Sequence, residues 1–445
     1  MRRAAALGAF LAATLCGAGA ACAANAQSKS QQPAKAAAAA ASSDASIAPL
    51  LQQVKAAFDK NDFAAAVDPL QRILAARPDD PIAHFQLGYA YSELKRWDDA
   101  KSEYSRAVAL DPKMAAAHLN LGLVLMDSDP AAAAESFRHA ADLQPKESRP
   151  RYLTGQALER AGKLPEASEQ YKAALALSPN DYEYHFALAR VLLRAGDPAG
   201  AEVQFRAAVA VRADAAPAQL GLASSLLAQK KYAGGAAALA EYLKLKPDDR
   251  GERLNRVSAL MEIDQFDEAL AELDRAETGT PPTVDSLKMR GGILMQQKKW
   301  QDAAATLTRA LQLSQTDPEL FAWLGRVELE LRDFPAAAKW LNQSLAMNPT
   351  GAGPLRDLVD AYYLGGEYPS TLAALDRLAQ LETPKPISWF VRATCYDKLM
   401  HKPEAIEAYQ KFLDLDQGKS DTQDFQARQR IRILEDELGR SPKKH

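Results

Sequence analysis

Apolar side chains recur along this chain at the spacing of amphipathic helices, in short segments separated by polar turns. In one such segment, a first apolar stripe contains Leu87, Tyr91 and Leu94, and a second begins at Ala100 and continues through Tyr104. Intervals of three and four residues place side chains on one face of an α-helix. The pattern predicts two consecutive helices that a short polar turn joins.

The same pair of stripes returns about every 34 residues between residues 47 and 419. When Pro81 is counted as position 1 of a unit, position 20 is alanine in nine of the eleven units. Position 32 is proline in seven units, for example Pro112 and Pro349. Chance alanines would not keep phase with these prolines, so the period predicts a repeat protein in which each unit packs on the next.

Each unit is expected to form two antiparallel helices, of which the second ends near a proline. Small residues at positions 8, 20 and 27 let the helix axes approach closely, and large residues at positions 4, 7, 11 and 24 fill the remaining space. Only the third unit is one residue short. The units span residues 47–80, 81–114, 115–147, 148–181, 182–215, 216–249, 250–283, 284–317, 318–351, 352–385 and 386–419.

This arrangement resembles the tetratricopeptide repeat, whose signature has Leu-Gly or Leu-Ala at positions 7 and 8, alanine at 20 and 27, and proline at 32. The direct matches are Leu87-Gly88, Leu121-Gly122, Leu188-Ala189, Leu222-Ala223 and Leu324-Gly325. The chain resembles the exported bacterial members of this family, and the resemblance covers residues 47–419. It implies an all-α fold, a right-handed superhelical solenoid of eleven tetratricopeptide helix pairs with a C-terminal capping helix.

The segment after the last unit, residues 420–438, has the pattern of that capping helix. Phe425, Ile431 and Leu434 are expected on its apolar side. A helix with a polar outer face protects the end of a solenoid from solvent. Residues 439–445 are expected to form a flexible tail.

Residues 1–26 have the pattern of a secretory signal peptide, in which an apolar run follows Arg2 and Arg3 and a small-residue cleavage site ends at Ala26. Residues 27–46 contain few large apolar side chains and predict a low-complexity linker. These features predict a periplasmic or secreted protein.

Cys22 leaves a second option open. The preceding Gly19-Ala20-Ala21 resembles a bacterial lipoprotein processing site, although the usual leucine three residues before the cysteine is absent. Acylation at Cys22 would give an outer-membrane lipoprotein. Cleavage after Ala26 would instead leave Cys395 as the only thiol, so no internal disulfide would be available.

Composition and motifs narrow the function classes. The 54 Lys and Arg residues are interspersed with 57 Asp and Glu residues, which argues against nucleic acid as a partner. No segment reaches the roughly 20 apolar residues of a transmembrane helix. The sequence has no phosphate-binding glycine loop or nucleophile elbow, and the repeats leave no room for a catalytic domain. We therefore expect neither enzymatic activity nor a cofactor.

Histidine placement does not favour a metal site. His84, His118 and His185 all occupy position 4 of their units, where other units have Phe321 or Trp389. We interpret these histidines as packing residues. No pair of histidines or cysteines has the spacing of metal ligands, so no metal is expected.

In the tetratricopeptide family, positions 2, 5, 6, 9, 12 and 13 of the first helix commonly face a concave groove that holds peptides or partner helices. Units two to five contribute to it Phe85, Tyr89, Asn120, Tyr152, Gln156, Arg160, Phe186, Arg190 and Arg194. The later units contribute a set without a consistent charge, Asn255, Trp323, Arg326, Arg356, Asp360 and Tyr363. The earlier set combines aromatic rings with solvent-facing arginines, which suits an extended peptide with an acidic group or a carboxylate terminus. Ordinary groove residues without a particular ligand are the alternative interpretation.

The predicted function is that of a non-catalytic protein–protein interaction scaffold that binds extended peptides or partner helices in its concave groove. One alternative is a lipid-anchored assembly factor of outer-membrane, secretion or polysaccharide-export machinery. Another is a regulatory subunit that recruits a separately encoded enzyme. The sequence names neither the partner nor the oligomeric state.

Overall fold

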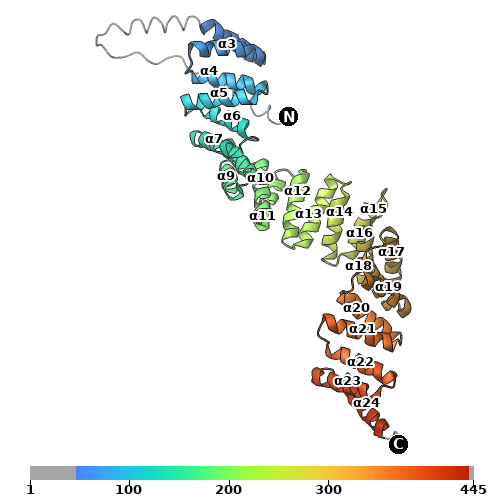
Figure 1. Ribbon diagram of the computed structural model, residues 1–445. Coiled ribbons are helices and arrows are strands. Elements are labelled where there is room, and N and C mark those ends of the chain that lie inside the picture. The colour runs from blue at the N-terminus through green and yellow to red at the C-terminus, as the bar shows by residue number, and fades with distance from the viewer. Residues whose placement is uncertain (1–46, 440–445) are drawn as a thin grey trace, which may run out of the picture. The chain divides into compact units, whose positions relative to one another are not determined.

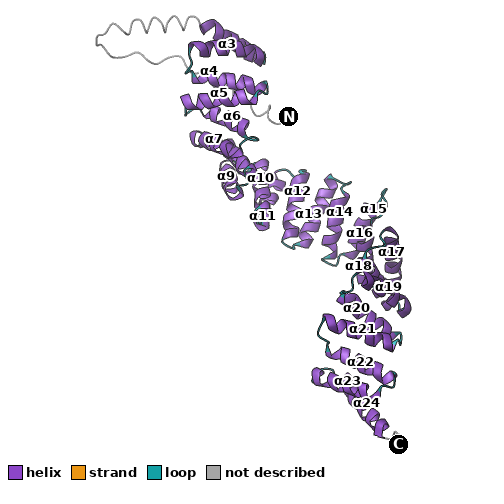
Figure 2. Cartoon of the chain, viewed as in Figure 1, coloured by secondary structure: helices purple, strands orange, loops and turns teal. Residues whose placement is uncertain are grey.

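The computed structural model describes residues 47–439, and all regular secondary structure in this range is helical (Figure 2). The expected signal peptide, the linker over residues 27–46 and Cys22 lie outside the described residues, as do residues 440–445 of the expected tail. The chain divides into two compact units, with the boundary between Lys246 and Pro247.

The helices of the first unit are those over residues 47–59, α3 (Phe63–Ala76), α4 (Pro81–Glu93), α5 (Trp97–Leu110), α6 (Ala115–Leu125), α7 (Pro130–Leu143), α8 (Ser148–Arg160), α9 (Leu164–Leu177), α10 (Tyr182–Arg194), α11 (Pro198–Val211), α12 (Ala216–Ala228) and α13 (Tyr232–Leu245). The helices of the second unit are α14 (Arg250–Met261), α15 (Phe266–Glu277), α16 (Val284–Gln296), α17 (Trp300–Leu313), α18 (Pro318–Glu330), α19 (Phe334–Met347), α20 (Ala352–Leu364), α21 (Tyr368–Leu381), α22 (Pro386–Lys398), α23 (Lys402–Asp416) and α24 (Asp421–Gly439).

Successive helices form pairs, and each pair packs on the next one within its unit (Figure 1). Helix α4 packs on α5, for example, and α8 packs on α9, while α7 packs on α8 and so joins two pairs. Over residues 47–439, eleven such pairs precede the final helix α24. The predicted all-α fold of tetratricopeptide-like helix pairs is therefore confirmed.

Aspartate–proline sequences start two of the first helices, α4 and α18. Asp80 precedes Pro81, the first residue of α4, and its Oδ1 accepts hydrogen bonds from the backbone N–H groups of Ile82 and Ala83 at 3.0 and 3.1 Å. Asp317 precedes Pro318 in the same way and caps α18. Proline has no N–H to leave unpaired at this position, and the aspartate satisfies the donors that follow.

The turn inside a pair commonly contains one residue with a left-handed backbone. Examples are Lys95, with a φ of 61°, and Gly162, with a φ of 77°. The third pair forms the repeat over residues 115–147, which is one residue short. None of the described residues between α6 and α7 has a positive φ. There Asp129 caps α7 by accepting the N–H of Ala132 at 3.0 Å. The deletion therefore falls in the turn and leaves the packing faces of both helices in phase.

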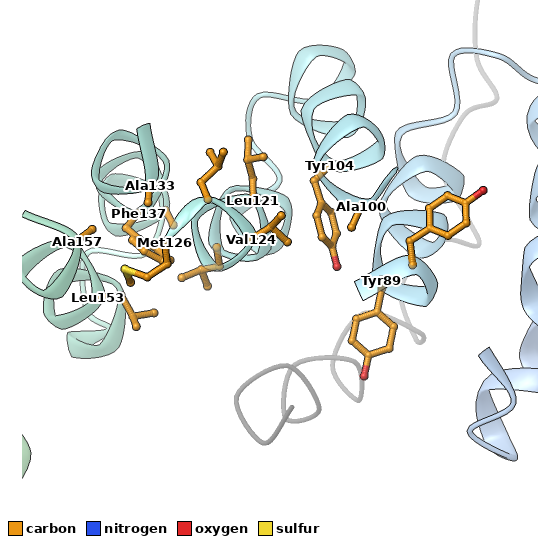
Figure 3. Packing of buried hydrophobic residues seen from close by; sticks show 14 of the residues in the cluster. Tyr89, Ala100, Tyr104, Leu121, Val124, Met126, Ala133, Phe137, Leu153 and Ala157 are labelled. Carbon is orange, nitrogen blue, oxygen red and sulfur yellow. The ribbon is translucent and has the colours of Figure 1, made fainter. Parts of the chain in front are cut away.

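Small residues lie where the two helices of a pair cross. Ala100 at position 20 is fully buried, and so are most of its equivalents. A Cβ added to Gly88 would lie 2.9 Å from the ring of Tyr104, and one added to Gly122 would lie 2.6 Å from the ring of Phe137. Figure 3 shows Tyr104 and Phe137 in this packed interior. The glycine at position 8 thus makes room for the large side chain at position 24.

The last helix, α24, packs on α23 at the C-terminal end of the second unit. Leu434 is buried, and Arg430 donates hydrogen bonds of 2.7 and 2.6 Å to the two carboxylate oxygens of Asp397 on α22. The expectation for Phe425 is wrong, because this side chain is 65% exposed. Phe425 and Leu434 are nine residues apart, which at 3.6 residues per turn puts them on opposite faces of the helix.

Candidate functional site

Six of the nine predicted groove residues lie together on α8 and α10, the first helices of two neighbouring pairs. Tyr152, Gln156 and Arg160 follow one another at intervals of four residues along α8, and Phe186, Arg190 and Arg194 do the same along α10. The two rows occupy the same positions of their units. Because α8 and α10 are in contact, the rows form one continuous surface.

The buried carboxylate of Glu159 joins the two helices. Glu159 is 8% exposed, and Arg190 donates to its two oxygens from Nε and Nη2 at 3.1 and 2.7 Å. Arg194 donates from Nη1 at 2.7 Å, and the hydroxyl of Tyr171 on α9 donates at 3.1 Å. Four donors thus converge on one carboxylate, which is how a buried charge is normally tolerated.

The surface beside Glu159 carries excess positive charge. Gln156, Glu159, Arg160, Arg190 and Arg194 line an open depression of about 590 Å³. The side chains of Arg190 and Arg194 are 47% and 52% exposed, although both bind the one buried carboxylate. Arg160 on the rim forms an exposed ion pair with Asp127. Two guanidinium groups that share one carboxylate keep donors for an incoming anion, such as a carboxylate of a partner.

Aromatic rings form one side of this surface. The ring of Tyr152 lies 4.6 Å from that of Tyr184 and 5.6 Å from that of Tyr171, between centroids. Gln156 donates from Nε2 to the Tyr152 hydroxyl at 2.7 Å. Burial raises the pKa of Tyr152 to about 12, so its hydroxyl stays protonated at neutral pH. Tyr152, the one partly exposed ring of the three, therefore adds an uncharged aromatic surface to the row that contains Gln156 and Arg160.

Phe85, Tyr89 and Asn120 lie on α4 and α6 and do not belong to this cluster. Phe85 is partly buried and packs with its ring 5.8 Å from that of Tyr104. Tyr89 is only 6% exposed, because its ring packs 6.0 Å from Phe58 and 5.7 Å from Phe63 of the preceding pair. Tyr89 is therefore buried, and the expectation that it lies accessible in the groove is wrong.

Asn120 differs from the expectation in the same way, with 7% exposure. It is one of two side chains that hydrogen-bond to the hydroxyl of Tyr104, whose pKa burial raises. Both Tyr89 and Asn120 thus act in the packing between consecutive pairs. Large side chains of a neighbouring helix pair cover Tyr89 and Asn120, so neither residue is exposed in the groove.

Glu159 is the residue of this site that the position-by-position reasoning missed. It occupies position 12 of its unit, one of the groove positions, but the predicted set for units two to five contains only aromatic, amide and cationic residues. A signal existed in the sequence, because Arg190 and Arg194 lie 31 and 35 residues after Glu159. A separation close to one repeat length places side chains on adjacent first helices.

The position-4 histidines have a structural explanation. Each one lies with Nε2 close to the carbonyl oxygen of a proline six residues earlier: His84 at 2.9 Å from Pro78, and His185 at 2.8 Å from Pro179. Since a carbonyl only accepts, the histidine donates, and it ties the first helix to the end of the preceding unit. No group of histidine, cysteine, aspartate and glutamate side chains suited to a metal ion occurs among the residues that the structure describes.

No helix within residues 47–439 is both long and apolar enough to span a bilayer. The candidate lipidation site Cys22 falls outside this range.

Sequence models of the tetratricopeptide repeat match most of the described chain. One matches residues 127–182, 152–208, 186–250 and 254–318, and another matches residues 57–121 and 294–350. None of the curated proteins matches this chain.

Solved structures similar to this one include three proteins of low sequence identity. MamA from Desulfovibrio magneticus is 20% identical over 38% of this chain and 96% of that chain, with a TM-score of 0.36. YrrB, described as a TPR protein with an unusual peptide-binding site, is 20% identical over 40% of this chain and 93% of that chain, with a TM-score of 0.37. A tetratricopeptide repeat protein from Parabacteroides merdae is 17% identical over 56% of this chain and 98% of that chain, with a TM-score of 0.37.

Proposed function

The chain belongs to the tetratricopeptide repeat family, and we propose that it is a non-catalytic scaffold that binds an extended acidic segment of a partner protein along its first helices. The observation that carries this proposal is the sharing of one buried carboxylate, Glu159, by Arg190 and Arg194. The pair leaves a positive charge in a depression that Gln156 also lines, and Gln156 donates to the hydroxyl of Tyr152.

Glu159 prepares the site for its ligand. A free arginine side chain samples many rotamers and loses this freedom on binding. Here Glu159 holds Arg190 through two hydrogen bonds and Arg194 through one, so much of that entropy is lost already when the protein folds. Each guanidinium has five N–H donors, of which Glu159 uses only a part. The remaining donors suit a carboxylate of the partner.

Short labelled peptides test this proposal on the full chain. One probe is a Gly/Ser peptide that ends in an acidic pair with a free C-terminal carboxylate, and a second is the same peptide with amides in place of all carboxylates. Fluorescence polarisation at low ionic strength would compare their affinities, because surface ion pairs weaken with salt. We expect the acidic peptide to bind and the amide peptide to bind at least roughly tenfold more weakly, as the loss of a charge-assisted contact implies.

Two variants locate the binding. Arg194→Gln and Arg160→Gln remove exposed charges from the depression and keep Arg190 on Glu159, so the fold should persist. Arg138→Gln is the matched control, since Arg138 forms an exposed pair with Glu135 on α7, away from the depression. Acidic-peptide affinity should fall in the first two variants and stay unchanged in the control. Equal affinity for both peptides, or no effect of either variant, would refute the proposed site.

We further propose an exported location, supported by the charged start, apolar run and small-residue site within residues 1–26. Determination of the N-terminus after expression in a bacterial host tests it. A mature chain that starts at Gln27 would support export without an anchor. A chain that starts at an acylated Cys22 would support the lipoprotein alternative, and a chain that retains residues 1–26 would contradict export.

A further inference from the structure

The second unit contains an open cleft of about 610 Å³, which two of the later predicted groove residues, Trp323 and Arg326, help to line. It lies across the first helices α16, α18 and α20 of three consecutive pairs, and the first helix is also the one that carries the arginine cluster in the first unit. A volume of this size lies within the range of clefts that bind small ligands, roughly 300–1,000 Å³.

The floor of the cleft is apolar and open. The indole of Trp323 lies against Gly292, where an added Cβ would lie 3.8 Å from Cζ3 of the ring, and Met295 lines the same region. On the opposite side of the cleft, a Cβ added to Gly353 would meet no atom within 4 Å. Trp323 is partly exposed, so it presents an aromatic surface to whatever enters.

Carboxylates outnumber cations around this floor. Asp357 on α20 lines the cleft with a side chain that is 22% exposed, and its nearest cation, Arg326, is 3.8 Å away. Asp360 lies one turn further along α20 and interacts with the same arginine. Burial raises the pKa of Asp357, which indicates that Arg326 compensates the desolvated carboxylate incompletely.

The other cation near Trp323 is already shared by two acids. Lys288 lies 5.7 Å from the centre of the Trp323 ring, and its Nζ is 3.0 Å from Asp317 and also contacts Glu319. Arg356 on α20 is held by both oxygens of Glu382 and does not add charge to the cleft. The cleft therefore combines an aromatic floor with negative charge, the reverse of the arginine cluster around Glu159.

We propose that this cleft is a second subsite, which binds a basic side chain of an extended partner segment. The apolar stem of a lysine or arginine packs on Trp323 and Met295, and its charged head pairs with Asp357 and Asp360. This inference rests on the proposed scaffold function and adds to it a position of opposite charge preference on the second unit.

Three peptides test the second subsite on the full chain. Each is a Gly/Ser peptide with a central apolar residue followed by arginine, glutamine or glutamate. Fluorescence polarisation should give the arginine peptide the highest affinity, and the glutamine peptide should bind roughly tenfold more weakly, as expected for one lost charge-assisted contact.

Two variants should remove this preference by different means. Asp357→Asn keeps the shape and removes the charge, whereas Gly353→Leu fills the cleft from a helical position with open space around it. Asp302→Asn is the control, because Asp302 is an exposed residue of the second helix α17. Arginine-peptide affinity should fall roughly tenfold in each of the first two variants and stay constant in the control. Melting temperatures would show that all three variants fold.

The outcomes separate the two proposals. Equal affinity for the three peptides, undetectable binding of all three, or unchanged binding in both Asp357→Asn and Gly353→Leu would overturn the basic subsite. Binding of the acidic peptide to the Glu159 region should survive Asp357→Asn in every case. Loss of acidic-peptide selectivity alone would overturn the proposed site on α8 and α10 and leave the basic subsite standing.

Discussion

Arg190 on α10 holds the buried carboxylate of Glu159 on α8 through two N–H donors, at 3.1 and 2.7 Å. The two residues come from consecutive helix pairs, so this contact belongs both to the candidate binding surface and to the packing of one pair on the next. The expectation that Arg190 and Arg194 are simple solvent-facing charges therefore needs correction. A charge reversal at either position would place a carboxylate beside Glu159 and disturb the fold as well as the site.

Arg190→Ala should destabilise the first unit, because it removes two of the four donors to a carboxylate that is 8% exposed. The expected loss is about 1–2 kcal/mol, the lower part of the range for a buried acceptor, since Arg194 and Tyr171 remain. Chemical denaturation followed by circular dichroism measures it. Arg138→Ala, which breaks only an exposed pair, is the control, and an equal loss in both variants would contradict the role of Glu159.

Gly155→Ala should lower the melting temperature although alanine favours helices over glycine. A Cβ at Gly155 would lie 2.6 Å from the ring of Tyr171, which is fully buried and cannot move aside. The overpacking cost of about 1–3 kcal/mol exceeds a propensity gain of about 1 kcal/mol. Gly353→Ala offers the matched comparison, because its Cβ would meet open space. Stabilisation by Gly155→Ala would show that the ring does not limit this position.

Acidic pH should weaken the third helix pair through His118. Burial, with a smaller contribution from His139, lowers the pKa of His118, so the folded protein binds its proton less readily than the unfolded chain does. This contribution to stability is complete above the ordinary histidine pKa of about 6.5 and is lost as the pH falls below it. His118→Gln should therefore flatten the fall in melting temperature on acidification.

The glutamine variant has a native counterpart at the same position of another unit. Gln219 donates from Nε2 to the carbonyl of Ala213 at 3.4 Å, as His118 does to that of Pro112 at 3.0 Å. His401→Gln, at an exposed residue, is the control for the loss of a histidine. An unchanged pH profile in His118→Gln would assign the acid sensitivity to other groups.

Glu272→Gln should destabilise the second unit strongly. Glu272 is 1% exposed, and it binds the largely buried guanidinium groups of Arg253 and Arg256. Removal of one partner from a buried ionic cluster leaves uncompensated charge and costs about 3–5 kcal/mol. Tryptophan fluorescence during urea unfolding is a suitable probe, because four of the five tryptophans lie after Pro247. Asp302→Asn, at an exposed residue of α17, should shift the midpoint little; a comparable shift would refute the cluster's role.

Most of the fold is predictable from the sequence because the packing is local and repeated. The first helices α4, α6 and α18 begin at Pro81, Ala115 and Pro318, which are also the first residues of their repeat units. The contact between Gly88 and Tyr104 recurs between Gly155 and Tyr171, so one unit explains the others. The prediction that Phe425 is buried was wrong because α24 occurs only once in the described chain, so no repeated copy indicates which of its faces packs on α23.

The candidate site is less predictable, because the repeat position of a residue indicates the direction of its side chain but not which neighbouring side chains cover it. Arg160, Arg190 and Arg194 do line one depression. Tyr89 has the same position number as Arg190, yet Phe58 and Phe63 cover it. The side chains of the adjacent pair decide the outcome, and these vary between units. For the same reason, the repeat position of Glu159 does not reveal that its carboxylate binds Arg190 and Arg194.

Within residues 47–439, the helices of each compact unit pack mainly on helices that are their neighbours in the chain. Duplication or deletion of one whole repeat within the gene would therefore preserve every kind of contact that the remaining pairs make. The number of helix pairs that separate the acid-binding and base-binding positions along the sequence can then change in steps of one repeat during evolution, which would supply variants that present the two positions on different repeats.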